Sequence, residues 1–196
     1  MPSTRQYGPT AAPGAAGLLA AQTAGAIAGV LPALQTVTVS TETVILNPSL
    51  NSATQALVLN IPSGGPNEQR PFDILASGYI STGTSSTVTV KLYSGTSTTV
   101  GSDTLLGSSG AITAFSGKCP WYLRATLVYD SVSGKLQGSI KFMVNNTLVA
   151  ETAISNVPTG LNNNTGNPVA SFVLSVTFGT ANAANQINVQ DFCTAF

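Results

Sequence analysis

A strict alternation of apolar and polar side chains over residues 121–144 constrains the fold of this chain more than any other feature. In the first half, one side of an extended strand carries Trp121, Leu123, Ala125, Leu127 and Tyr129, and the other side carries Tyr122, Arg124, Thr126 and Val128. The alternation resumes after residues 130–134, with Leu136, Gly138, Ile140, Phe142 and Val144 on one side and Lys135, Gln137, Ser139, Lys141 and Met143 on the other. A period of two predicts two half-buried antiparallel strands joined as a hairpin.

The sequence on both sides of this hairpin is also typical of strands, because Thr and Val are frequent and turn residues recur at short intervals. The further predicted strands are 36–46, 56–61, 72–81, 87–92, 112–115, 147–155, 173–178 and 186–192. Asn145 and Asn146 predict a tight turn after the hairpin, because Asn tolerates positive φ. Loops are predicted over 62–71, 94–110 and 157–168, and no segment after residue 35 has a helical period.

These strands predict an all-β domain over residues 36–196. An antiparallel two-sheet sandwich of jelly-roll type fits their number and length best. A nine-stranded immunoglobulin-like sandwich is the alternative, but no Cys–Trp–Cys spacing supports it.

Residues 1–35 differ from the rest, because Ala, Gly and Pro dominate and no charge occurs between Arg5 and Glu42. Such a segment cannot form its own core, so it is predicted to be an extended N-terminal arm that lies on a neighbouring subunit. The candidate partner-binding residues are its larger side chains, Tyr7, Leu18, Leu19, Ile27, Val30, Leu31 and Leu34. A membrane span or a signal peptide is an alternative, weakened by the small residues and by Pro32. A helix packed on its own domain is another.

Charged residues are scarce and scattered, which argues against an enzyme. They make up 7% of the 196 residues, against about 25% in a typical domain, and the chain has no His. Acid–base catalysis, activated nucleophiles and metal sites need such groups brought together. We therefore predict no catalytic, cofactor-binding or metal-binding residue. A net charge of zero also argues against a nucleic-acid partner.

Three further features each allow two interpretations. Cys119 and Cys193 are either free, buried thiols or a disulfide. Trp121 is either a core aromatic, as its apolar side of the strand indicates, or part of a sugar-stacking platform, for which Tyr122 on the opposite side is the better candidate. The polar loops 83–86, 94–102 and 161–167 are either sugar-binding or ordinary surface loops.

Three stretches of the sequence resemble virion proteins of tailed bacteriophages. They are FDILASGYISTGTSSTVTVKLY (72–93), GKCPWYLRATLVYDSVSGKLQGSIKFMVNN (117–146) and FVLSVTFGTANAANQINVQDF (172–192). The resemblance lies in the general residue pattern and in the order of the strands, and it includes no catalytic motif. It implies a jelly-roll head-decoration (cement) protein on the capsid surface, a homotrimer that binds the major capsid protein or other virion proteins. The alternative is a carbohydrate-binding module of a tail fibre or a cell-surface protein.

Overall fold

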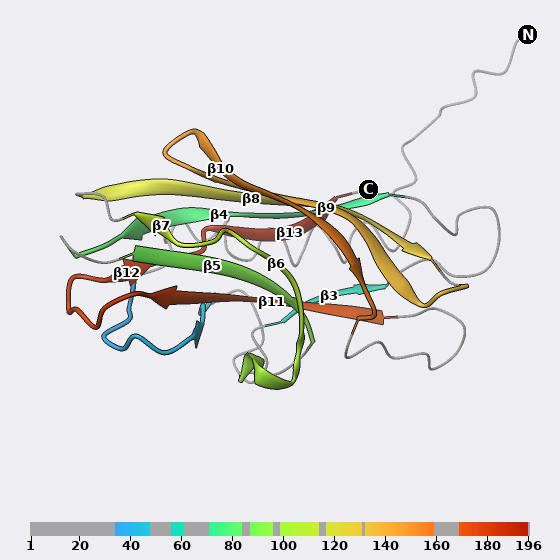
Figure 1. Cartoon of the computed structure of the whole chain (residues 1–196), viewed down its shortest axis with the longest axis horizontal. Helices are drawn as coiled ribbons and strands as arrows, with labels where there is room; N and C mark the ends of the chain where they lie inside the picture. The colour runs from blue at the N-terminus through green and yellow to red at the C-terminus, as the bar shows by residue number, and fades with distance from the viewer. Residues whose placement is uncertain are drawn as a thin grey trace, which may run out of the picture.

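Two antiparallel β-sheets pack face to face as a sandwich (Figure 1). The computed structural model describes residues 34–47, 56–60, 71–83, 87–95, 99–113, 117–130, 132–158 and 169–195. Within these ranges there is no α-helix, and one short 3-10 turn, η1, covers Val100–Ser102. The predicted all-β, two-sheet fold is therefore confirmed, whereas its jelly-roll type stays a prediction.

The first sheet, called sheet A, has seven strands among the described residues. In spatial order they are β1 (Gln35–Thr36), β12 (Gln186–Ile187), β4 (Phe72–Ser81), β8 (Lys118–Asp130), β9 (Lys135–Val144) and β10 (Thr147–Asn156), with β13 (Asp191–Ala195) also paired to β4. The partners of β12 and β13 on β4 are Ile80–Ser81 and Asp73–Ser77, so β12 and β13 follow one another along β4.

The second sheet, called sheet B, has six strands in the part of the chain that the structure describes. In spatial order they are β2 (Thr43–Val44), β11 (Val169–Phe178), β5 (Thr87–Ser94) and β6 (Thr104–Ser108), with β3 (Leu57–Asn60) on β11 and β7 (Ile112–Thr113) on β5. The centre of sheet B is therefore formed by β11, which comes late in the chain and pairs with strands from its first half.

The hairpin predicted over 121–144 is confirmed as β8 and β9, with Trp121 opposite Val144 and Asp130 opposite Lys135. Its apolar side faces the core, except that Tyr129 is half-buried and Gly138 is exposed. The turn predicted at Asn145 and Asn146 is also confirmed, because both residues have positive φ, 50° and 61°. It leads directly into β10.

The core lies between the inner faces of the two sheets. Phe72 of sheet A meets Phe172 of sheet B, with ring centroids 6.3 Å apart. Gly107 of β6 allows this close approach, because a Cβ atom there would lie 2.3 Å from Cγ2 of Ile140 in the opposite sheet. The largest fully buried side chains are Phe142, Phe172, Phe178, Ile74, Ile80, Leu92, Leu123, Leu127, Leu136, Ile140, Leu174 and Ile187.

Three predicted boundaries are wrong. The segment 36–46 is not one strand, since only the ends of the segment Gln35–Val44 pair, as β1 and β2. The segment 186–192 is interrupted between β12 and β13, where Asn188 instead bonds through its own amide and side chain to Tyr79. The loop predicted over 94–110 contains β6, because Tyr93 and Leu105 pair within sheet B.

Of the predicted arm, only Leu34 and Gln35 belong to the described residues. Leu34 is half-buried, and Gln35 begins β1. The side chain of Gln35 donates to the Val44 carbonyl (3.2 Å) and accepts from the Leu46 amide (2.8 Å). It thereby ties the first strand to the segment that covers sheet B. The other candidate contact residues, Tyr7, Leu18, Leu19, Ile27, Val30 and Leu31, lie outside the described residues.

Cys119 and Cys193 are both free thiols, so the alternative of a disulfide between them is wrong. Cys119 pairs with Ile80 and Cys193 with Leu75, on opposite edges of β4 and five residues apart along it. That offset alone corresponds to about 16 Å along a strand, well beyond the reach of a disulfide. Burial raises the pKa of the Cys193 thiol.

Candidate functional site

The outer face of sheet A, called the open face, carries the side chains that leave the sandwich from β4, β8, β9 and β10. The register places Ser77, Tyr122, Met143 and Leu148 in one row across these four strands. Leu148 and Tyr122 are exposed, while Met143 and Ser77 are half-buried. One end of this row is thus apolar and accessible, and the other is polar.

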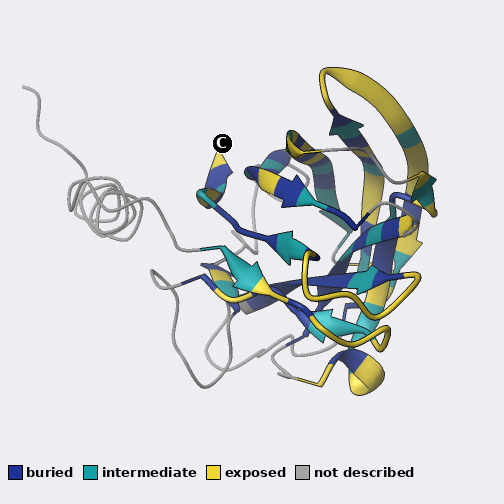
Figure 2. Cartoon of the chain, turned by 90° about the vertical axis from the view of Figure 1, so that its left-hand side faces the viewer, coloured by how far each residue is buried: buried dark blue, intermediate teal, exposed yellow. Residues whose placement is uncertain are grey.

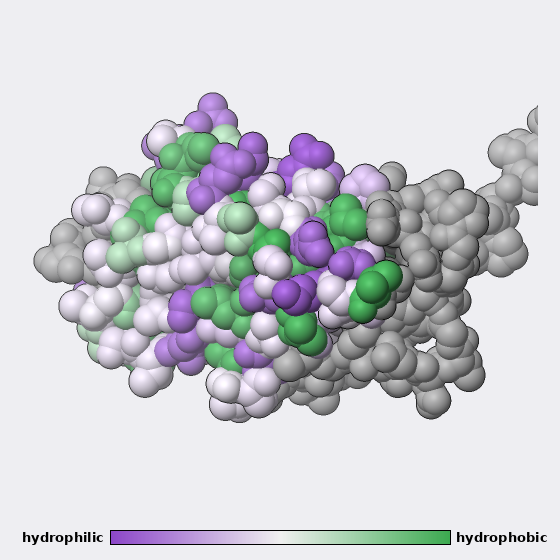
Figure 3. Space-filling model, turned by 45° about the vertical axis from the view of Figure 1, so that its right-hand side comes forward, coloured by the Kyte–Doolittle hydropathy of each residue, from purple (hydrophilic) through white to green (hydrophobic). Residues whose placement is uncertain are grey.

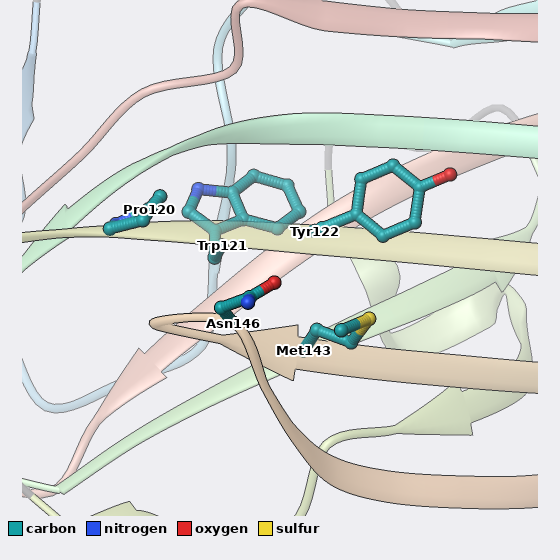
Figure 4. A pocket seen from close by; sticks show the side chains of 5 residues that line it. All are labelled: Pro120, Trp121, Tyr122, Met143 and Asn146. Carbon is teal, nitrogen blue, oxygen red and sulfur yellow. The ribbon is translucent and has the colours of Figure 1, made fainter.

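A hollow of about 250 Å³ opens at the apolar end of the row. It is lined by Pro120, Trp121, Tyr122, Met143 and Asn146, which come from the start of β8, from β9 and from the turn before β10 (Figure 4). The Asn145 amide donates to the Pro120 carbonyl at 2.8 Å, so the turn is fastened to the start of β8. The walls of the hollow are therefore held by strand pairing and a tight turn.

Trp121 supports the hollow from the core side. Its indole N–H donates to the Asn188 carbonyl at 3.1 Å, and the side chain is buried. Gly78 makes room for this contact, because a Cβ atom there would lie 2.0 Å from the Asn188 oxygen and 3.0 Å from the indole nitrogen. The interpretation of Trp121 as a core aromatic is confirmed, and Tyr122 is the exposed aromatic of the pair.

Two ion pairs lie on the open face, while the exposed Lys118 of β8 has no ion-pair partner among the described residues. Arg124 donates to Asp73 at 2.6 Å, and Lys141 lies 3.2 Å from Glu151. The hydrogen bond to Asp73, reinforced by its charge, raises the pKa of the fully exposed Arg124 guanidinium. No group of three or more His, Cys, Asp or Glu side chains that could hold a metal ion occurs in the described part of the chain.

β10 forms one edge of sheet A and is exposed along most of its length (Figure 2). Seven of its ten residues are exposed, among them Leu148 and Val149. Its far end is held by Asn156, whose side-chain amide donates to the Leu105 carbonyl of β6 at 2.8 Å. Within the described ranges, no strand pairs with the outer side of β10.

The outer face of sheet B is covered instead by its own chain. Val44, Ala56, Tyr93, Val100 and Val173 form a second, smaller apolar cluster there. They come from β2, β5 and β11 of sheet B, from the residue before β3 and from η1, so segments distant in sequence meet on this face. The hollow nearby has a volume of about 450 Å³ and is lined by Glu42, Thr43, Val44, Thr99, Val100 and Gly101.

Glu42 holds the segment 42–44 against sheet B through hydrogen bonds to two of its residues. One carboxylate oxygen accepts from Lys91 Nζ at 2.9 Å and the other accepts from the Ser175 hydroxyl. Burial alone would raise the pKa of Glu42, but the hydrogen bonds from Ser175, Lys91 and Tyr93 outweigh it and lower that pKa. Burial likewise opposes the charge on Lys91, and its bond to Glu42 raises the pKa of Lys91 overall. The Glu42 carboxylate, the Lys91 amine and the Ser175 hydroxyl thus bond to one another and hold residues 42–44 against sheet B.

Comparison with known proteins gives no match to this chain among family models, curated proteins or solved structures. Across the described residues, no helix is long and apolar enough to span a membrane.

Sequence reasoning found Tyr122 but missed the residues around it. Met143 lies on the same polar side of the predicted hairpin as Tyr122, but the predicted loop over 130–134 would place Tyr122 opposite Phe142. In the structure Asp130 pairs with Lys135, so the loop is one residue shorter and Tyr122 pairs with Met143. Asn146 was assigned only to a turn. The correct register of β8 and β9 would therefore have identified the site, because it brings the turn at Asn145 and Asn146 next to the start of β8.

Proposed function

We propose that this chain is a non-enzymatic structural protein of a tailed-bacteriophage virion, which decorates the capsid surface and stabilises its lattice. The exposed edge of β10 carries this proposal. The amides and carbonyls along an open edge can pair with an extended segment of another chain. On β10 this edge runs past Leu148 and Val149, and Glu151 is its only charged residue.

The composition of the surface supports the same function. On the face drawn in Figure 3, green hydrophobic groups lie exposed among pale and purple ones over the described residues. A net charge of zero offers no overall repulsion between copies of the protein. Such a surface favours association with other protein, either identical copies or capsid subunits.

The proposed mechanism is mass action, because a protein that binds only the assembled lattice stabilises that lattice. A homotrimer would multiply weak contacts through effective concentration. The arm residues Tyr7, Leu18, Leu19, Ile27, Val30, Leu31 and Leu34 would add contacts to neighbouring subunits, at the entropic cost of ordering the arm. The capsid partners are the major capsid protein or other virion proteins, and neither nucleic acid nor a membrane is involved.

The test is the oligomeric state of the full chain, measured by light scattering. The wild type is expected to be a trimer at micromolar concentration. The double variant Leu148→Lys/Val149→Lys places charge on the edge of β10 and should shift the protein towards monomer. Val132→Lys is the matched control, because Val132 is 94% exposed and lies in the β8–β9 loop, away from this edge. A monomeric wild type, or equal effects of both changes, would contradict the proposal.

A further inference from the structure

We propose that the hollow beside Tyr122 binds one neutral pyranose ring of a glycan. This is a function beyond association with other protein. It depends on the hollow of the open face and not on the edge of β10, so either proposal can fail without the other.

The size and shape of the hollow limit the ligand to a small ring. Its volume of about 250 Å³ is below the roughly 300–1,000 Å³ of pockets that hold drug-sized molecules. Tyr122, Pro120 and Met143 supply apolar surface, and Figure 4 shows the Tyr122 ring at one end of the group with Asn146 and Met143 beside β8. An aromatic ring that is rigid and partly exposed presents a flat face, on which a saturated ring can lie.

The chemistry of the surrounding groups favours a neutral, hydroxylated ligand. None of the five lining residues carries a charge. Polar groups stand on both sides of Tyr122: the amide of exposed Asn146 lies on the β9–β10 side, and the Ser77 hydroxyl on the β4 side donates to Asp191 at 3.1 Å. A pyranose combines a face of C–H groups with a rim of hydroxyls, so it matches an apolar floor with the Asn146 amide at its edge.

The hollow is also formed before any ligand arrives. The turn is fixed by the Asn145–Pro120 bond, and the floor is fixed from below by the Trp121–Asn188 bond. Such preorganisation lowers the entropic cost of binding. With one aromatic contact and few hydrogen bonds, the expected affinity for a single sugar is in the millimolar range.

The experiment titrates the full chain with methyl glycosides of glucose, galactose, mannose and N-acetylglucosamine. Binding is followed by saturation-transfer NMR and by tryptophan fluorescence, which reports on the hollow because Trp121 is the only tryptophan of the chain and lines it. At least one glycoside should change the Trp121 emission and receive saturation at its ring C–H protons.

Three variants locate the contact. Tyr122→Ala should weaken binding about tenfold or more through loss of the stacking face. Tyr79→Ala is the matched control, because Tyr79 is 39% exposed, against 38% for Tyr122, and lies outside the hollow; binding should stay within about twofold. Asn146→Gly keeps the positive φ of 61° that the turn requires but removes the amide, and should weaken binding several-fold.

Two results would overturn the proposal. One is that none of the glycosides binds the wild type. The other is that Tyr122→Ala binds a glycoside as tightly as Tyr79→Ala does. If no glycoside binds while Tyr122→Ala disrupts self-association, the hollow is a protein contact and the sugar site is refuted. Since the wild-type fluorescence and NMR measurements need no variant, a substitution that fails to fold does not weaken the test.

Discussion

The outer faces of the two sheets differ in what covers them. On sheet B, Tyr93 is 7% exposed in its cluster with Val44, Ala56, Val100 and Val173, and the Glu42–Lys91 pair is largely shielded from water. On sheet A, Tyr122 is 38% exposed, and Arg124 and both members of the Lys141–Glu151 pair face solvent, although Asp73 is as shielded as Glu42. The same residue types thus stabilise the fold on one face and remain available for contacts on the other.

The largest effect should come from the core that both faces share. Leu127→Ala or Ile140→Ala should lower the free energy of unfolding by about 2–5 kcal/mol, because both side chains are fully buried and would leave cavities. Gln137→Ala, on the open face of the same ladder, should change it by no more than about 0.5 kcal/mol. Urea denaturation measures the three values, and a larger loss for Gln137→Ala would mean that the two sides of β9 are interchanged.

The sharpest test of the contrast compares the two tyrosines. Tyr93→Ala should cost about 3 kcal/mol in the free energy of unfolding, because it empties the small cluster on sheet B. Tyr122→Ala should cost less, about 1 kcal/mol, because 38% of Tyr122 is exposed and the residue is outside the core. Equal losses in thermal or urea unfolding would show that both faces contribute alike to stability.

The Glu42–Lys91 and Lys141–Glu151 ion pairs should contribute differently to stability as the pH changes. Because the folded protein lowers the pKa of Glu42, this group adds stability above its unfolded pKa near 4.5, and that stability is lost as the pH falls through the folded value. Glu42→Gln should therefore cost about 1 kcal/mol at neutral pH and less near pH 3, where the wild type has lost the same contribution.

The matched change on the open face is Glu151→Gln, which removes the partner of Lys141. It should alter the free energy of unfolding by no more than about 0.5 kcal/mol at neutral pH. Urea unfolding at both pH values decides the matter. A cost for Glu42→Gln that stays constant or grows on acidification would exclude the proposed role of this carboxylate.

The smallest effect is expected for Arg124→Ala. Its ion pair with Asp73 is short, but the guanidinium is exposed and its attraction is screened by water and salt. The free energy of unfolding should not change measurably at physiological salt. A measurable loss in a urea titration would indicate that the Arg124–Asp73–Thr126 group of hydrogen bonds braces sheet A.

The sequence predicted the meander β8–β9–β10 well, because long alternating strands and a two-residue Asn turn are local signals. It failed where distant side chains decide the structure. β1 and β2 are separate strands, and side-chain bonds from Gln35 to Val44 and from Lys91 to Glu42 hold the residues near β2 in place. β12 ends where Asn188 contacts Tyr79 and Trp121. The same limit applied to the site. Alternation identified Tyr122, whereas its neighbours depended on strand register and the covering of sheet B depended on contacts between residues such as Glu42 and Ser175.

The central position of β11 has a consequence for the synthesis of this protein on the ribosome. β2, β3 and β5 all pair with β11, which begins at Val169, so sheet B lacks its middle strand until most of the chain has been translated. The β8–β10 meander can pair as soon as it emerges, because its turns are short. The nascent chain therefore carries one half-built apolar layer with exposed edges, and it is in this interval, rather than after release, that the protein is most exposed to misassembly.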